Sequence, residues 1–146
     1  RPNTYPESTF WSRGNGWGLV ALAALADYLP AGAMRDRSRT LLKRHLLACL
    51  KVQDERGMWR QVMDLHTDAS YVETSGTGMI LYALATAIEH GVLPASHREA
   101  LVRGLEGYDR RNGFSPSSIS GSIFPGSSTS SEASVTPWYF PGRLPG

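Results

Sequence analysis

The chain has 146 residues, 41% of them hydrophobic, and its 15 Lys and Arg against 13 Asp and Glu give a net charge of +2 at pH 7. This length and apolar share suit one domain with a hydrophobic core, and so small and mixed a charge argues against a nucleic-acid partner. The longest apolar run, residues 17–26, is shorter than the roughly 20 residues of a membrane helix, so we expect no membrane partner. The single cysteine excludes an internal disulfide framework and favours a reducing compartment, the cytoplasm, although a chain that begins at Arg1 rather than Met leaves an upstream leader open.

The first helix is expected to follow a proline-containing loop over residues 1–12. It should begin at residue 15 or 16 and end near Tyr28, where the Leu-Pro-Ala-Gly stretch at 29–32 stops it. Residues 17–26 leave no polar face. A helix that is apolar all round is expected to be buried on all sides.

The next two segments differ from the first helix in their polarity. Residues 34–52 place leucines at helical spacing among Arg, Lys and Asp, which predicts an amphipathic helix with one side in water. Residues 53–74 are rich in loop formers, with a weak signal for a short strand over 58–63.

A second pair of helices is predicted after residue 74. Small apolar residues favour a helix over 75–90, with Gly91 as its left-handed cap. Ser96 and Glu99 have the spacing of a capping box, which opens an amphipathic helix to about Arg110.

The two halves of this region repeat one another. Residues 13–17 (RGNGW) align with residues 75–79 (SGTGM) at an offset of 62, and each half then has a buried helix, a Leu-Pro-Ala turn and a helix with a wet face. One interpretation is chance similarity between two helices of small residues. The other is a repeat of helical hairpins, with inner helices packed together and outer helices shielding them, as in an α/α toroid or solenoid. The fold class is then all-α.

The end of the chain changes in composition. We divide the chain into helical-hairpin repeats over 1–112 and a Ser/Pro/Gly-rich, irregular tail over 113–146. The aromatic cluster at 138–140 suggests that the end of the tail docks on another surface.

The strongest candidate binding residues are Trp11, Arg13 and Trp17, at the start of the first helix. Indole faces stack on sugar rings, Arg binds carboxylates in a bidentate manner, and a helix N-terminus offers free N–H groups. Together they suit an acidic sugar. The alternative is that both Trp side chains belong to the core and that Arg13 pairs with a structural carboxylate.

The equivalent stretch of the second repeat, Glu73–Gly78, is expected to open on the same end of the fold. Thr74 or Ser75 is predicted to cap the helix there. Tyr71, Glu73 and Ser75 are candidates to line the same cavity.

The sequence has few signals for metal, nucleotide or nucleophile chemistry. Asp64, His66 and Asp68 alternate as metal ligands can, but no fourth ligand is suitably spaced, and a solvated loop is the favoured interpretation, so we expect no metal and no cofactor. No phosphate-binding loop, dinucleotide fingerprint or nucleophile elbow is present. No carboxylate pair stands out as a glycosidase acid and nucleophile, so the catalytic residue stays unassigned. Cys49 is expected to be an inert core residue.

The stretch at 10–17 (FWSRGNGW) followed by an Ala-rich helix resembles glycoside hydrolase families 88 and 105, the unsaturated glucuronyl and rhamnogalacturonyl hydrolases. Residues 58–61 and 71–77 resemble later blocks of that family in the same order. The resemblance implies an (α/α)6 barrel of six hairpins. It also implies an enzyme that hydrates the C4=C5 double bond of an unsaturated uronic acid at the non-reducing end of an oligosaccharide, without metal or organic cofactor, and pectin-derived rhamnogalacturonan as the favoured source. Trp11, Arg13 and Trp17 would line the sugar subsite.

The resemblance further implies that the chain is the C-terminal portion of such an enzyme. The family's catalytic aspartates lie upstream of the RGNGW block, and the sequence supplies two hairpins where the barrel needs six. We therefore expect part of the site without its acid/base, apolar flanks exposed on the inner helices, and no turnover by this chain alone. The alternatives are a non-catalytic α/α-repeat binding module and another six-hairpin glycosidase.

Overall fold

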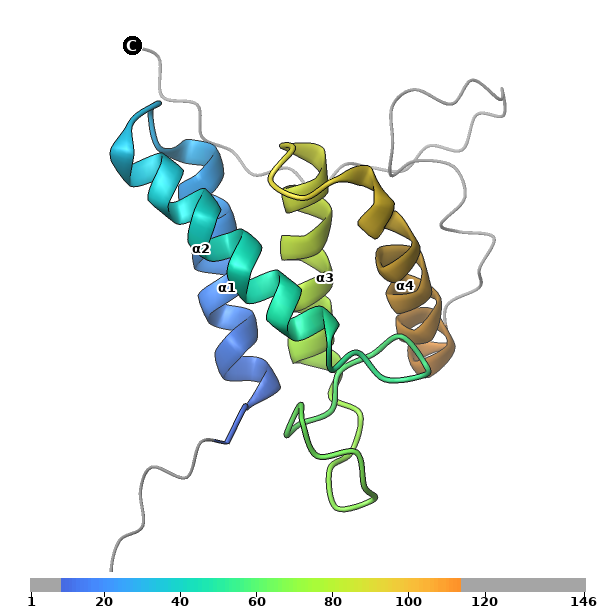
Figure 1. Ribbon diagram of the computed structural model, residues 1–146. Helices are drawn as coiled ribbons and strands as arrows, with labels where there is room; N and C mark the ends of the chain where they lie inside the picture. Colours follow the sequence, from blue (N-terminus) through green and yellow to red (C-terminus); the bar gives the residue numbers. More distant parts are fainter. Residues whose placement is uncertain (1–8, 114–146) are drawn as a thin grey trace, which may run out of the picture.

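The computed structural model describes residues 9–113 (Figure 1). Four α-helices account for most of them: α1 (Ser12–Tyr28), α2 (Ala33–Leu50), α3 (Thr74–Glu89) and α4 (Arg98–Asn112), with a short 3-10 helix, η1 (Ala95–His97), before α4. The all-α prediction is confirmed for this part of the chain. The expectations for the irregular tail and its aromatic cluster lie outside the described residues.

The helices form two antiparallel hairpins in two layers (Figure 1). The inner helices α1 and α3 lie side by side and run in the same direction, so their N-terminal ends meet at one end of the molecule. On one side of this pair, α2 packs against α1 and α4 packs against α3. The predicted repeat of inner and outer helices is therefore present in space as well as in sequence.

Small residues allow the inner helices to approach closely. A Cβ added at Gly16 would lie 2.9 Å from the Cβ of Met79, and one added at Gly76 would lie 1.9 Å from the Oγ of Ser12. Real Cβ atoms are not found this close to other heavy atoms, so glycine is required at both contacts. The core forms one cluster across both hairpins, and its fully buried side chains include Leu19, Ala23, Leu42, Leu46, Trp59, Ile80, Ala83, Leu84 and Ala87.

The first helix differs from its prediction in two ways. It begins at Ser12, so Arg13 lies in the first helical turn rather than in the preceding loop. It is also not buried on all sides, because Trp17, Leu25 and Tyr28 are exposed. The exposed face points away from the faces of α1 that contact α2 and α3. The expectation that the inner helices carry exposed apolar flanks is confirmed on α1.

The connection over residues 51–73 contains no strand, so the short strand predicted over 58–63 is wrong. Two isolated antiparallel bridges occur instead, Trp11 with Val62 and Arg60 with Val72. This connection still enters the core, because the Trp59 indole is fully buried and its Nε1 donates to the carbonyl of Cys49 at 2.8 Å.

The helix ends agree only partly with the signals expected for them. Gly91 has a φ of 65° just beyond α3, as predicted for a left-handed cap. The capping box at Ser96 and Glu99 is wrong: α4 begins after His97 without a side-chain cap, and the Ser96 hydroxyl lies beside the His97 ring instead. No helix in the described residues is long and apolar enough to cross a membrane.

Candidate functional site

Three chain segments meet at the N-terminal ends of α1 and α3. The middle one, residues 59–63, is hydrogen-bonded on one side to residues 10–12 and on the other to residues 71–73. The four backbone bonds are Ser12 N to Gln61 O at 3.0 Å, Met63 N to Phe10 O at 2.9 Å, Gln61 N to Tyr71 O at 2.8 Å and Glu73 N to Trp59 O at 2.9 Å. The two glycine-rich stretches of the sequence are thereby joined through the connection between the hairpins.

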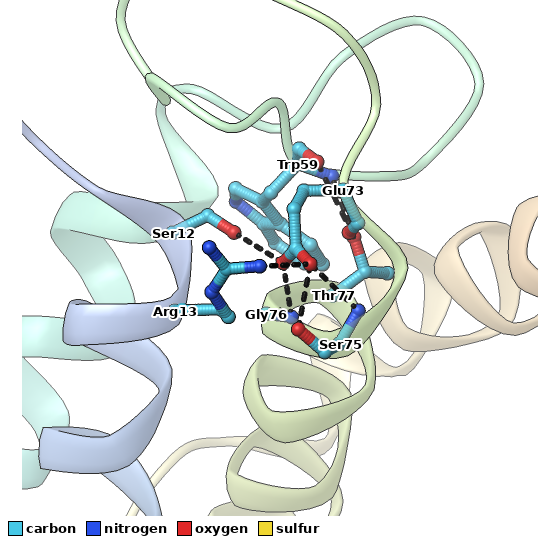
Figure 2. Close-up of polar contacts among 7 residues, drawn as sticks. All are labelled: Ser12, Arg13, Trp59, Glu73, Ser75, Gly76 and Thr77. Atoms are coloured by element: carbon cyan, nitrogen blue, oxygen red, sulfur yellow. Dashed lines mark hydrogen bonds and ion pairs between the residues drawn. The ribbon is translucent and has the colours of Figure 1, made fainter.

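Glu73 lies at the centre of this junction (Figure 2). This residue is buried and is the N-cap of α3. Its Oε1 accepts hydrogen bonds from the N–H and the hydroxyl of Ser75, at 3.2 and 2.6 Å, and its Oε2 accepts from Gly76 N and from the Ser12 hydroxyl, the latter at 3.1 Å. The prediction that Thr74 or Ser75 caps the helix is wrong. Glu73 has an extended backbone just before the helix, and its side chain reaches the N–H groups of Ser75 and Gly76 in the first turn.

Arg13 is the fifth donor to this carboxylate. Its Nη1 lies 3.5 Å from Oε1 of Glu73, and the two side chains are 56% and 9% exposed, respectively. Arg13 therefore pairs with a structural carboxylate, as one of the two interpretations of the sequence required. Because a guanidinium carries five N–H donors and only Nη1 contacts Glu73, this exposed side chain still has donors available for another group.

The environment of Glu73 keeps it ionised. Burial raises the pKa of its carboxyl, but hydrogen bonds from the Ser75 hydroxyl, the Gly76 N–H, the Ser12 hydroxyl and the Ser75 N–H together outweigh burial and leave the pKa below its ordinary value. A general acid at neutral pH needs a raised pKa. Glu73 is thus suited to hold other groups in place and not to donate a proton.

The aromatic candidates are exposed rather than part of the core. Trp11, Trp17 and Tyr71 are 49%, 67% and 55% exposed, so the interpretation of both Trp residues as core is wrong within the described part of the chain. Arg13 and Trp17 are four residues apart on α1 and so share one helix face. Ser75 is also exposed, but its hydroxyl is engaged by Glu73.

Several residues of the junction were not identified from the sequence. Ser12 and Thr77 are fully buried, and the Thr77 hydroxyl donates to the carbonyl of Glu73 at 2.7 Å while accepting from Trp59 N at 3.1 Å. A buried hydroxyl needs such partners, but nothing in the sequence marks these two among the many Ser and Thr residues.

A second polar contact ties the start of α1 to α2. The amide nitrogen of Asn15 donates to the Trp11 carbonyl at 2.8 Å, so its oxygen faces Nε2 of His45, also at 2.8 Å, and the imidazole donates from Nε2. Burial lowers the pKa of His45. Asn15, the Asn of the RGNGW stretch, thus connects the backbone of Trp11 to the side chain of His45 on α2.

The acidic loop provides no metal site in the described residues. Asp64, His66 and Asp68 are all exposed, and residues 9–113 hold no group of three or more potential ligands placed to bind a metal ion.

Comparison with known proteins gives consistent results. The family model described as Glycosyl Hydrolase Family 88 matches residues 1–111. A curated "Unsaturated 3S-rhamnoglycuronyl hydrolase" from Alteromonas sp. (strain LOR) is 35% identical over 88 residues, which are 60% of this chain and 21% of the relative. A protein of the same name from Formosa agariphila is 35% identical over 95 residues, 64% of this chain and 25% of the relative.

A solved structure extends the match to the fold. A glycoside hydrolase of family 105 from C. acetobutylicum ATCC 824 superposes with a TM-score of 0.67 at 35% identity, over 70% of this chain and 29% of that chain. The chain therefore spans about a fifth to under a third of the length of these proteins. The four helices form part of an (α/α)6 toroid.

Proposed function

The chain belongs to glycosyl hydrolase family 88, and we propose that it contributes the sugar-binding wall of an enzyme acting on oligosaccharides with an unsaturated uronic acid at the non-reducing end. The observation that carries this proposal is that the Arg13 side chain and the indoles of Trp11 and Trp17 are all exposed at the start of α1, with Arg13 and Trp17 four residues apart on one helix face. A planar cation and aromatic rings that are exposed at the same end of a helix suit a sugar ring that bears a carboxylate.

Each of these residues has a role that follows from its chemistry. Arg13 binds the uronate carboxylate through charge-assisted hydrogen bonds, and Trp11 and Trp17 pack on the faces of the sugar rings. We assign exposed Tyr71 to the same surface, because it lies two residues before Glu73 on the segment that pairs with residue 61. Glu73 and Ser75 support this surface, because Glu73 accepts hydrogen bonds from Ser75, from Ser12 and from Arg13.

The reaction is hydration followed by ring opening. A proton is added to C4 of the C4=C5 double bond and the oxygen of a water molecule to C5, which gives a hemiketal at C5. The hemiketal opens to a ketone, and the linkage at C1 then releases the rest of the oligosaccharide, so that one water is consumed overall. Neither a metal nor an organic cofactor takes part. The favoured substrate is an oligosaccharide derived from the rhamnogalacturonan of pectin.

The proton donor is not among the residues assigned to this wall, since Glu73 is held ionised. We place it in hairpins that complete the ring. Two features support an incomplete ring: the exposed apolar face of α1, and an apolar groove of about 560 Å³ between α3 and α4, lined by side chains that include Leu81, Tyr82, Leu101 and Leu105. In a closed toroid, both faces would pack against neighbouring hairpins.

The test is an absorbance assay on the gene product extended upstream of Arg1. An unsaturated galacturonyl-rhamnose disaccharide absorbs in the ultraviolet through its conjugated double bond, and hydration removes this absorbance. We expect turnover by the extended protein and none by the chain of 146 residues alone. Replacing Arg13 by Ala should raise KM about 30-fold, because a charged partner is lost from the carboxylate.

The matched control is Arg37→Ala, which removes an exposed arginine near the N-terminal end of α2 and should leave KM unchanged. Absence of turnover by the extended protein would overturn the proposed activity. An Arg13→Ala enzyme with the wild-type KM would overturn the role of Arg13.

A further inference from the structure

The contact between Arg13 and Glu73 joins an exposed side chain that has many rotamers to a buried carboxylate that has few. An arginine side chain that is 56% exposed has many rotamers available, whereas the Glu73 carboxylate is 9% exposed. Only Nη1 of the guanidinium is directed at Glu73, at 3.5 Å (Figure 2). The donors on Nε and Nη2 are thereby left for another group.

In addition to its contact with Arg13, the Glu73 carboxylate accepts four hydrogen bonds that hold it in place. Two come from the first turn of α3, whose N-terminus also favours a negative charge, and one each from the hydroxyls of Ser75 and Ser12. The bond from Ser12 crosses from α1 to α3. The carboxylate therefore moves only if the two inner helices move, and its position is set by the core.

We propose that Glu73 is a positioning residue that orients the Arg13 guanidinium, so that the Nε and Nη2 donors face the sugar carboxylate as a fixed pair. This inference rests on the proposed function. Bidentate recognition of a carboxylate requires both N–H groups to point along nearly parallel lines. A guanidinium held at Nη1 meets that requirement before the substrate binds, so less conformational freedom is lost on binding.

The negative charge of Glu73 acts in the opposite direction, because it repels a substrate carboxylate. Two features reduce this repulsion. The donors around Glu73 and the α3 N-terminus already compensate its charge, and the outer edge of Arg13 lies in solvent, where salt screens charges. The orienting effect should therefore exceed the repulsion, which fixes the sign of the expected change.

Two substitutions at Glu73 separate its orienting effect on Arg13 from its roles as a helix cap and as a negative charge. Glu73→Asp keeps the charge and a good helix cap, but it withdraws the carboxylate by one methylene, about 1.5 Å, from Arg13 and Ser12. Glu73→Gln keeps the length and removes the charge. Glu89→Gln is the matched control, because it removes an exposed carboxylate at the far end of the same helix, about 24 Å away.

The measurement is KM and kcat of the extended gene product in the absorbance assay, on unsaturated galacturonyl-rhamnose and on its methyl ester. The ester has nearly the same shape without the charge. The quantity compared is the preference for acid over ester, expressed as a ratio of KM values. We expect Glu73→Asp and Glu73→Gln each to reduce this preference about tenfold, with circular dichroism unchanged for the Asp variant, and Glu89→Gln to keep it. In an Arg13→Ala background, neither substitution should reduce the preference further.

The outcomes are distinguishable. A wild-type enzyme without turnover, or without a preference for the acid, overturns the proposed function and this inference with it. A wild-type preference that Arg13→Ala abolishes but both Glu73 variants retain overturns the inference alone. The same holds if the variants bind the acid more tightly, since Glu73 would then only repel it, or if they weaken acid and ester equally, since its role would then be structural.

Discussion

A methyl group added at Gly76 tests the contact on which the whole junction depends. In Gly76→Ala, the new Cβ would lie 1.9 Å from Oγ of Ser12, 2.7 Å from Oε2 of Glu73 and 2.8 Å from the backbone carbonyl carbon of Ser12. The Ser12 hydroxyl can rotate away, but the backbone of α1 cannot. The N-terminal ends of α1 and α3 must therefore separate, and the buried bond between Ser12 and Glu73 is lost.

The size of the effect follows from three contributions. Overpacking costs about 1–3 kcal/mol, and loss of a buried hydrogen bond to a charged group costs about 1.5–3 kcal/mol. Alanine in place of a helical glycine returns about 1 kcal/mol. We expect Gly76→Ala to lower the free energy of unfolding by about 1.5–5 kcal/mol.

The control for Gly76→Ala is Gly78→Ala, two residues further along the same helix. There the added Cβ would lie 3.5 Å from the ring of Tyr108, an ordinary contact, so the helix-propensity gain of up to about 1 kcal/mol should be visible. Urea unfolding followed by far-ultraviolet circular dichroism gives both free energies. A Gly76→Ala protein as stable as the wild type would refute the close approach of the two inner helices. Adding Ser12→Ala should recover only part of the loss, because the backbone contact remains.

Two further predictions concern the outer helix α2. Burial lowers the pKa of His45 below its unfolded value of about 6.5, so the unfolded chain binds more protons as the pH falls, and the stability present above pH 6.5 should decline toward pH 5. His45→Gln should show a smaller fall in Tm between about pH 7.5 and about pH 5, and identical falls would contradict this. Burial also raises the pKa of the Cys49 thiol to about 12, so a chromogenic disulfide reagent should label it slowly in the native chain and quickly in urea. Rapid labelling of the folded protein would show that Cys49 is accessible.

Much of the fold could be predicted from the sequence. The repeat of RGNGW and SGTGM, each followed by small apolar residues, indicated two close-packed inner helices, and the leucine spacing of residues 34–52 indicated a covering helix. These signals are local, because helix formation and capping by a left-handed glycine such as Gly91 depend on residues within one or two turns. The site was only partly predictable. Arg13 and Glu73 were both candidates, but their mutual contact was not foreseen.

The sequence by itself determined the class of the fold, the order of its helices and the stretch around Arg13 that carries the family resemblance. Tertiary structure alone decided which polar group caps α3, that Ser12 and Glu73 meet across 61 residues, and which face of α1 is left exposed at Trp17 and Tyr28. The physical reason is that a hydrogen bond between helices depends on their separation and rotation, which the packing of glycines against Met79 and Ser12 sets. No residue pattern within either segment contains that information.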